Sequence, residues 1–126
     1  MANDRKFFRC NVCGNIVELI QEGGGTLVCC GQEMELLTAN TTDGAFEKHV
    51  PAVKREDGKL EVQVGSVAHP MIPEHYIQWI AVAQGARVQR FSLKPGEAPV
   101  AAFEIEDGPA TVYEYCNLHG LWKVEI

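Results

Sequence analysis

The sequence predicts a mainly β protein with a small metal-binding module at residues 1–37 and a seven-strand immunoglobulin-like antiparallel β-sandwich at residues 38–126. Four of the five cysteines lie within the first thirty residues, where apolar residues are too few to stabilise an independent fold without a metal or a disulfide. Seven later runs have the length and apolar pattern of strands, and turn-forming residues separate them. No segment shows a sustained helical period, so we expect strands throughout.

The predicted module brings two pairs of thiols together. A short strand, residues 7–10, enters a turn between Cys10 and Cys13, where Gly14 allows a left-handed backbone. Cys29 and Cys30 return to the first pair after a strand, a turn of three glycines and a last short run, residues 16–20, 23–25 and 27–31. The four sulfurs form a predicted tetrathiolate metal site. A disulfide pair is the alternative, and the strain of a bond between adjacent cysteines disfavours it.

The predicted sandwich follows a threonine-rich linker, residues 37–44. Its elements are short runs that alternate in polarity or are continuously apolar. Turn signals such as Asp57-Gly58 and Pro95-Gly96 occur at the spacing of an antiparallel sandwich. The predicted strands are residues 50–54, 60–64, 77–82, 87–91, 100–105, 110–115 and 121–126.

The net charge of -6 argues against a nucleic-acid partner, which requires a basic surface. It also disfavours an anionic substrate unless a local positive site, such as an exposed metal with a neighbouring lysine, attracts one. No apolar signal segment follows the charged start at residues 1–6, and no run is long enough to span a bilayer. We therefore expect a cytoplasmic protein with reduced cysteines, which bind metal more often than they form disulfides.

A second metal site is predicted in the sandwich. Cys116 and His119 have metal-ligand spacing on a turn that follows a strand-like run. The other three histidines, His49, His69 and His75, also lie in loops that flank strands, where a β scaffold presents ligands. Any one of them alone would be interpreted as a surface or hydrogen-bonded histidine. Together with the spare cysteine they favour a second metal site.

Residues 7–36 resemble desulforedoxin, a small protein whose Cys-x-x-Cys and Cys-Cys pairs hold one iron. The resemblance implies iron at Cys10, Cys13, Cys29 and Cys30. Tetrahedral sulfur ligation does not separate iron from zinc, and zinc could occupy this site in a recombinant preparation. Adjacent cysteines are unusual for a zinc ribbon, and their contracted spacing predicts a distorted tetrahedron.

Four motifs extend the resemblance to the whole chain, which is similar to desulfoferrodoxin, the two-iron superoxide reductase family. In that family the histidines matching His49, His69, His75 and His119 lie in a square plane around iron, and the cysteine matching Cys116 binds from one axial side. Departures fall only at flanking positions such as Glu74 and Leu121. The motifs are residues 47–51 (EKHVP), 65–71 (GSVAHPM), 75–80 (HYIQWI) and 115–120 (YCNLHG).

The resemblance implies one-electron reduction of superoxide to hydrogen peroxide, a detoxification that releases no dioxygen. An external electron is then needed for each turnover, and the family points to rubredoxin-type donors, with the tetrathiolate iron as a possible relay. Glu47 matches the glutamate that can occupy the open axial position after oxidation. Lys48 matches a lysine placed over that position, so both are expected to be catalytic. The family also forms homodimers.

Two other functions remain open from the residues alone. The chain could be an electron-transfer or metal-storage protein that uses both irons without a substrate. It could also join a zinc-ribbon interaction module to an immunoglobulin-like binding domain. An open coordination position, detected by azide or cyanide, would separate the enzyme from the first alternative. Colour and metal analysis would separate it from the second, because zinc is spectroscopically silent.

Overall fold

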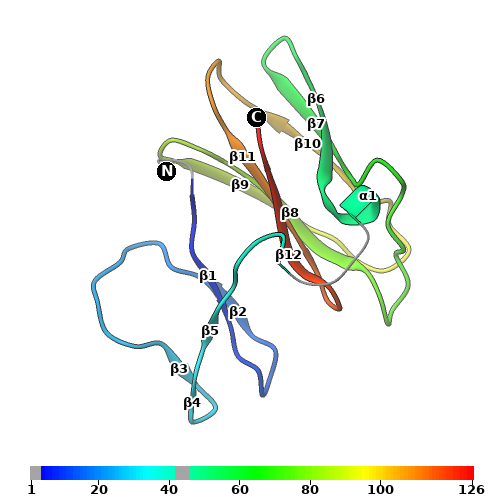
Figure 1. Cartoon of the computed structure of the whole chain (residues 1–126). Helices are drawn as coiled ribbons and strands as arrows, with labels where there is room; N and C mark the ends of the chain where they lie inside the picture. Colours follow the sequence, from blue (N-terminus) through cyan, green and yellow to red (C-terminus); the bar gives the residue numbers. More distant parts are fainter. Residues whose placement is uncertain (1–3, 42–45) are drawn as a thin grey trace. The chain divides into compact units, whose positions relative to one another are not determined.

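The structure is a computed structural model that describes residues 4–41 and 46–126, and of Phe46 and Glu47 it describes the backbone only. The chain divides into two compact units, Asp4–Thr38 and Ala39–Ile126, each described here by itself. Figure 1 draws the first unit from blue to cyan and the second from cyan to red. Among the described residues, no helix has the length and apolar character needed to cross a membrane.

The first unit is built from five short strands (Figure 1). β1 (Phe7–Arg9) lies between β2 (Ile16–Glu18) and β5 (Glu35–Leu36), and both pairings are antiparallel. β3 (Val28–Cys29) and β4 (Gln32–Glu33) form a separate hairpin. The predicted strand at residues 16–20 is shorter in the structure, where β2 ends at Glu18. β4 and β5 were not predicted, because a strand of two residues has no alternating pattern in the sequence.

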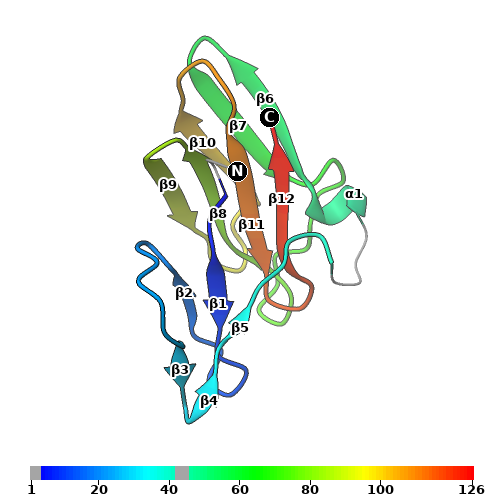
Figure 2. The same ribbon diagram turned by 60° about the vertical axis from the view of Figure 1, so that its left-hand side comes forward.

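The second unit is a sandwich of two antiparallel sheets (Figures 1 and 2). One sheet has three strands in the order β10-β7-β6, and the other has four in the order β12-β11-β8-β9. A single helical turn, α1 (Phe46–His49), precedes β6. The strands are β6 (Pro51–Glu56), β7 (Lys59–Val64), β8 (Ile77–Gln84), β9 (Arg87–Ser92), β10 (Val100–Glu104), β11 (Thr111–Cys116) and β12 (Gly120–Glu125).

The fold class predicted from the sequence is confirmed: a small cysteine-rich unit and a β-sandwich. Each predicted strand of the sandwich begins and ends within two residues of an observed one. Pro51 begins β6, an edge strand, which is one of the few places where proline fits a sheet. The helical turn α1 is a correction, because the sequence placed His49 in a loop.

The core lies between the two sheets. On β7 the side chains alternate, with Leu60, Val62 and Val64 buried and the intervening residues exposed. Ile80 and Val112 from the other sheet belong to the same buried cluster. Alternation of this kind buries one face of the sheet. Each Å² of apolar surface removed from water stabilises the fold by about 25 cal/mol.

Antiparallel pairing places the histidine-bearing segments at one end of the sandwich. Pro51, which follows α1, pairs with Val64, where β7 ends and the loop to β8 begins. At the same end Cys116 pairs with both Ile77 and Gly120, so β8 begins where β11 ends and β12 begins. The loop that precedes β8 and the β11–β12 turn lie near each other in both ribbon views (Figure 2).

Candidate metal centres

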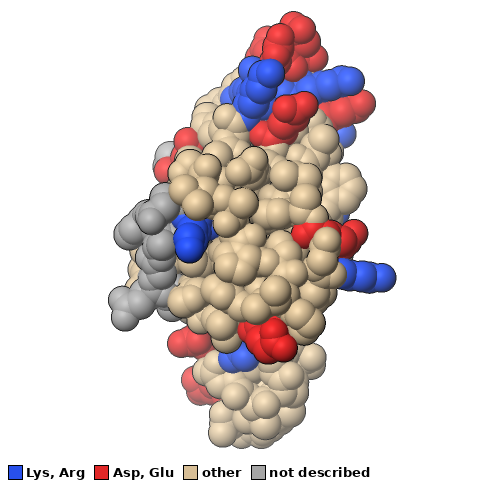
Figure 3. Space-filling model, turned by 90° about the vertical axis from the view of Figure 1, so that its right-hand side faces the viewer, with Lys and Arg blue, Asp and Glu red and all other residues tan. Residues whose placement is uncertain are grey.

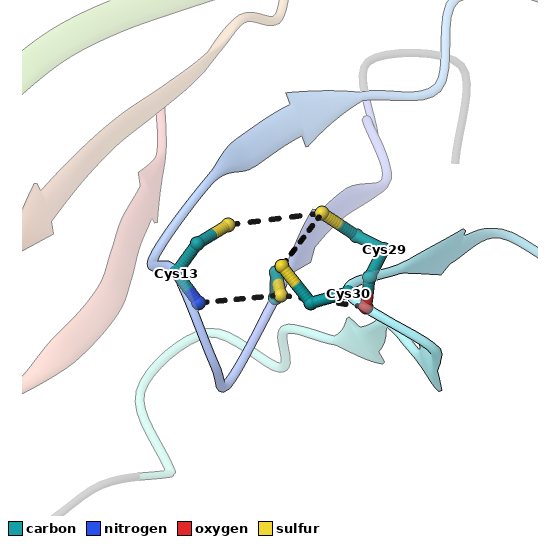
Figure 4. Close-up of side chains that lie close together, drawn as sticks. Cys13, Cys29 and Cys30 are labelled. Atoms are coloured by element: carbon teal, nitrogen blue, oxygen red, sulfur yellow. Dashed lines mark hydrogen bonds between the residues drawn. The ribbon is translucent and has the colours of Figure 1, made fainter.

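The four cysteines of the first unit converge on one point (Figure 4). Their sulfur atoms all lie within 4.8 Å of one another, and all are free thiols. The Cys13 and Cys29 sulfurs are 3.7 Å apart, and those of Cys29 and Cys30 are 3.9 Å apart. Four sulfurs placed tetrahedrally at about 2.3 Å from one metal lie about 3.8 Å apart. These residues fit a tetrathiolate metal, and the disulfide alternative is wrong.

Left-handed backbone at two turns makes this arrangement possible. Gly14 has φ 83° in the turn after Cys13, and its N–H donates to the Cys10 carbonyl at 2.9 Å. Cys30 and Gly31, with φ 54° and 73°, form the two-residue turn of the β3–β4 hairpin. In a regular strand, adjacent side chains point to opposite faces. The turn at Cys30 brings both thiols to the same side.

The electrostatics of the four thiols also favour a bound cation. Backbone hydrogen bonds from Cys13 and Val12 lower the pKa of the Cys10 thiol to about 6. Hydrogen bonds with the neighbouring thiols of Cys13, Cys10 and Cys29 raise the pKa of Cys30 to about 12. Without a metal, Cys10 is therefore more readily ionised than Cys29 and Cys30, whose pKa values are both raised. Four thiolates can coexist only around a cation that displaces the thiol protons.

The second group forms at the sandwich end described above. His49 is the last residue of α1, His69 and His75 lie in the loop between β7 and β8, and Cys116 ends β11. Possible ligand atoms of these four residues lie within 4.8 Å of one another. His119, in the turn before β12, is not in this group of four but lies beside it, with its ring centre 4.9 Å from that of His49.

The four imidazole rings stand at the corners of a square. Neighbouring ring centres are 4.6 Å apart for His49–His69, 4.7 Å for His69–His75, 5.0 Å for His75–His119 and 4.9 Å for His119–His49. Across the group His49 and His75 are 6.5 Å apart. Four similar sides and one longer diagonal are consistent with a square arrangement of the rings.

Two nitrogen atoms of this group have a separation that fits a shared metal ion. The Nε2 atoms of His49 and His69 are 3.1 Å apart. Two nitrogens held about 2.1 Å from one metal at right angles lie about 3.0 Å apart. His75 Nε2 is buried and has no hydrogen-bond partner within the described part of the chain, so a metal would satisfy it. His69 Nδ1 lies 2.7 Å from the Pro70 carbonyl oxygen and donates to it, which leaves the Nε2 lone pair facing inward.

Burial keeps the imidazoles of His69 and His75 neutral, which is the form that binds metal. It also favours the protonated form of the Cys116 thiol, whose proton a metal must displace. Burial lowers the pKa of His69 to about 4, and His49 and His75 add to this effect. The pKa of His75 is also lowered, first by burial and then by the charges of His119 and Lys48. Burial raises the pKa of the Cys116 thiol although the N–H groups of Leu118 and His119 hydrogen-bond its sulfur, so a cation is needed to ionise it.

Several supporting residues were not predicted. Trp122 is fully buried, stacks on the His49 ring at 4.9 Å, and donates from Nε1 to the His119 carbonyl at 3.0 Å. Glu114, two residues before Cys116, is also fully buried, and burial raises the pKa of its carboxyl. Both lie inside apolar strand runs, where the sequence pattern indicates only core.

The two predicted catalytic residues belong to α1. Lys48 is exposed, and its charge reaches His75, whose pKa it helps to lower. Successive residues of a helical turn point about 100° apart, so Lys48 and His49 do not face opposite ways as they would in a strand. The side chain of Glu47 lies outside the described part of the chain.

Family models match both units of the chain. The model described as "Desulfoferrodoxin" matches residues 41–125, and the model described as "Desulfoferrodoxin, N-terminal domain" matches residues 2–37. The chain belongs to the desulfoferrodoxin family. The two side-chain groups described above are consistent with the two iron sites of desulfoferrodoxins.

Relatives and solved structures agree with this membership. A desulfoferrodoxin from Nitratidesulfovibrio vulgaris is 51% identical over 126 residues, covering 99% of each chain. A superoxide reductase from Pyrococcus abyssi is 33% identical over 111 residues, covering 71% of this chain and 94% of its own. The crystal structure of the superoxide reductase from Treponema pallidum superimposes with a TM-score of 0.76 at 32% identity, covering 96% of this chain and 98% of that one.

Proposed function

We propose that this desulfoferrodoxin is a superoxide reductase with iron at His49, His69, His75, His119 and Cys116. The square of four imidazoles with a buried thiol carries the proposal, in a chain whose relatives include proteins named superoxide reductase. When bound, the iron supplies one electron to superoxide, which takes up two protons and leaves as hydrogen peroxide. Five protein donors leave one of six octahedral positions free for a small ligand.

We propose that the substrate reaches the side of the histidine group that faces away from Cys116. Cys116 is fully buried in the core, so its sulfur approaches the square from the protein interior. Lys48 is exposed beside His75. A small anion therefore arrives from the side on which Lys48 lies.

Lys48 supplies the local positive charge that an acidic protein needs to capture an anion. The chain carries a net charge of -6, and on the face drawn in Figure 3 the Lys and Arg side chains do not gather into one large patch. A single lysine beside the site raises the local concentration of superoxide without changing the overall charge. Attraction of this kind is screened by salt over about 8 Å at physiological ionic strength.

Lys48→Ile is expected to slow the bimolecular reaction with superoxide by about tenfold at low salt and to weaken its dependence on ionic strength. Later steps should change little. Stopped-flow measurement of the second-order rate constant across a salt series checks this result. Lys59→Ile is the matched control, because it removes the same charge at the opposite end of β7 from the ligand loop. Equal rates for the Lys48 variant and wild type at every salt concentration would exclude steering by Lys48.

Glu47 is proposed to bind the free position after oxidation. It lies two residues before His49, and a carboxylate oxygen is a good ligand for ferric iron. Glu47→Ala is expected to leave the first reaction with superoxide nearly unchanged and to alter the final ferric absorption spectrum. Glu61→Ala, which removes an exposed acid from the middle of β7, should leave that spectrum as it is. A wild-type ferric spectrum in the Glu47 variant would contradict the proposed ligation.

The first unit is proposed to take electrons from an external one-electron donor of the rubredoxin type. Cys13 and Cys30 are exposed, so a metal bound there lies near the surface of the unit, where a donor can approach. Free cysteines fit a reducing compartment, and we place the protein in the cytoplasm. We also propose a homodimer, on the family resemblance, in which strand edges such as that of β9 form the contact.

An anion-binding measurement tests the proposal against a carrier that has no substrate. A free coordination position predicts that azide changes the absorption spectrum of the histidine-ligated iron and leaves the tetrathiolate bands unchanged. An iron with six protein ligands would show no response. That outcome would favour a simple electron carrier and contradict the reductase.

A further inference from the structure

Asn117 joins two segments that carry metal ligands. It follows Cys116 directly, yet its side chain does not serve the β11–β12 turn. Its Oδ1 accepts a hydrogen bond from the Tyr76 N–H at 2.9 Å, and its Nδ2 donates to the Glu74 carbonyl at 3.1 Å. Its own N–H donates to the Tyr76 carbonyl at 3.2 Å. All three bonds end on the residues that flank His75.

The segment around His75 is attached on either side, where the Met71 carbonyl accepts from the Gly96 N–H at 2.8 Å and Ile77 pairs with Cys116. Its own backbone bonds are local, since the N–H groups of Ile72 and His75 each donate to the carbonyl of the other at 3.1 and 3.0 Å. The attachment to β11 begins at Ile77, which pairs with Cys116 at the start of β8, and the side-chain bonds of Asn117 extend it to Tyr76 and Glu74. His75 Nε2 has no partner that would hold the ring in place. The two side-chain hydrogen bonds of Asn117 therefore help to set where the His75 ring stands relative to Cys116, because they hold the residues on both sides of His75.

We propose that Asn117 is a positioning residue that fixes the His75 imidazole against the Cys116 sulfur, and thereby sets iron retention and the strength of the iron–thiolate bond. The inference rests on the proposed function, because it requires iron at this site. Asn117 touches neither the ligand atoms nor the substrate side. It acts through its bonds to Glu74 and Tyr76, which keep His75 close to Cys116 although the two ligands are 41 residues apart in the sequence.

A simpler role for Asn117 would be that of a turn-forming residue, since asparagine favours tight turns. The two roles predict different results. A turn former contributes to the folding of the hairpin and leaves the iron unaffected once the domain is folded. A positioning residue changes the iron site in a domain that is folded.

The experiment compares three variants of the full chain loaded with iron in both sites. Asn117→Ala removes both side-chain bonds. Asn117→Asp keeps the oxygen that accepts from Tyr76, replaces the donor to Glu74 by an acceptor, and adds a negative charge. Gln84→Ala is the matched control, because the Gln84 amide makes equivalent bonds to backbone groups of Glu106 and Gly108 at the other end of β8.

Two quantities are measured: the rate at which a ferrous chelator removes the histidine-ligated iron, and the thiolate charge-transfer band of the ferric form. Loss of an outer-shell partner typically weakens metal binding by about 10- to 100-fold, so we expect Asn117→Ala to lose iron faster by that factor and to shift the band. Asn117→Asp should fall between Ala and wild type. Gln84→Ala should lower the melting temperature without changing either quantity, and the tetrathiolate bands serve as an internal reference in every sample.

Wild-type iron retention and an unshifted band in Asn117→Ala would overturn the inference and leave the proposed function intact. If Asn117→Ala does not fold, Asn117→Asp gives the same test, and wild-type behaviour in that variant would overturn the inference equally. A wild-type protein that holds no iron at the histidines would overturn the proposed function together with the inference.

Discussion

Replacement of Cys116 by serine is expected to abolish reaction with superoxide while the tetrathiolate metal stays bound. Cys116 supplies the only anionic donor among the proposed ligands of the second unit, and serine replaces a strong donor with a poor one. Loss of an outer-shell partner alone costs about 10- to 100-fold, so loss of this ligand should cost more. Stopped-flow kinetics and iron analysis of the purified variant measure the effect.

The thiolate charge-transfer band distinguishes ligation from packing in this variant. The band should disappear in Cys116→Ser even if the four imidazoles still retain some iron. Cys116→Ala provides a second variant, because it removes the sulfur without adding a hydroxyl to the apolar core that surrounds it. An intact band with unchanged turnover in either variant would remove Cys116 from the iron.

Replacement of Cys13 by serine is expected to have the complementary effect. The four sulfurs of the first unit lie within 4.8 Å of one another and share no residue with the histidine group, so the two sites should be separable. Cys13→Ser should lose the tetrathiolate metal and much of the folding stability of residues 4–38, because binding of a structural metal is worth about 10 kcal/mol or more. The histidine-ligated iron should stay bound and still react with superoxide.

Metal analysis and the rate of reaction with superoxide check the result for Cys13→Ser. Limited proteolysis measures the loss of stability, since cleavage should concentrate in the first unit. Loss of the histidine-ligated iron as well would show that the two units do not fold and bind metal independently.

The strands of the sandwich were predictable because each signal is local. On β7 the alternation of Leu60, Val62 and Val64 with polar residues gives both the strand and its buried face. Turn residues such as Asp57-Gly58, both with positive φ, mark where strands end. The one-turn helix α1 carries no periodic signal in four residues, so the sequence could not distinguish it from a loop.

The ligand residues were predictable from residue type, whereas their geometry was not. Cysteine and histidine residues in strand-flanking segments can be recognised as metal ligands from their side-chain chemistry and their spacing. The square of imidazoles depends on contacts between segments far apart in the chain, such as the stacking of Trp122 on His49 and the bonds from Asn117 to Glu74 and Tyr76. Tryptophan in a strand and asparagine in a turn both have ordinary structural explanations, so neither is recognised from sequence alone.

The position of the two adjacent cysteine sulfurs also depends on a backbone conformation that the sequence did not predict. Their contracted spacing predicted a distorted tetrahedron, and in a regular strand the two side chains would point to opposite faces. The left-handed conformation of Cys30, with φ 54°, brings its sulfur beside that of Cys29 at 3.9 Å. A non-glycine residue with positive φ is uncommon, so Cys30 does not indicate a turn in the sequence. Only the second turn position, Gly31, has the residue type that such a turn favours.

The product stoichiometry of the iron-loaded protein tests the central claim most directly. Superoxide is supplied to the full chain in the presence of a reduced one-electron donor, and hydrogen peroxide, dioxygen and oxidised donor are measured together. A superoxide reductase yields one hydrogen peroxide and one oxidised donor for each superoxide consumed, with no dioxygen. Release of dioxygen in equal amount to hydrogen peroxide, without oxidation of the donor, would show a dismutase and contradict the proposed function.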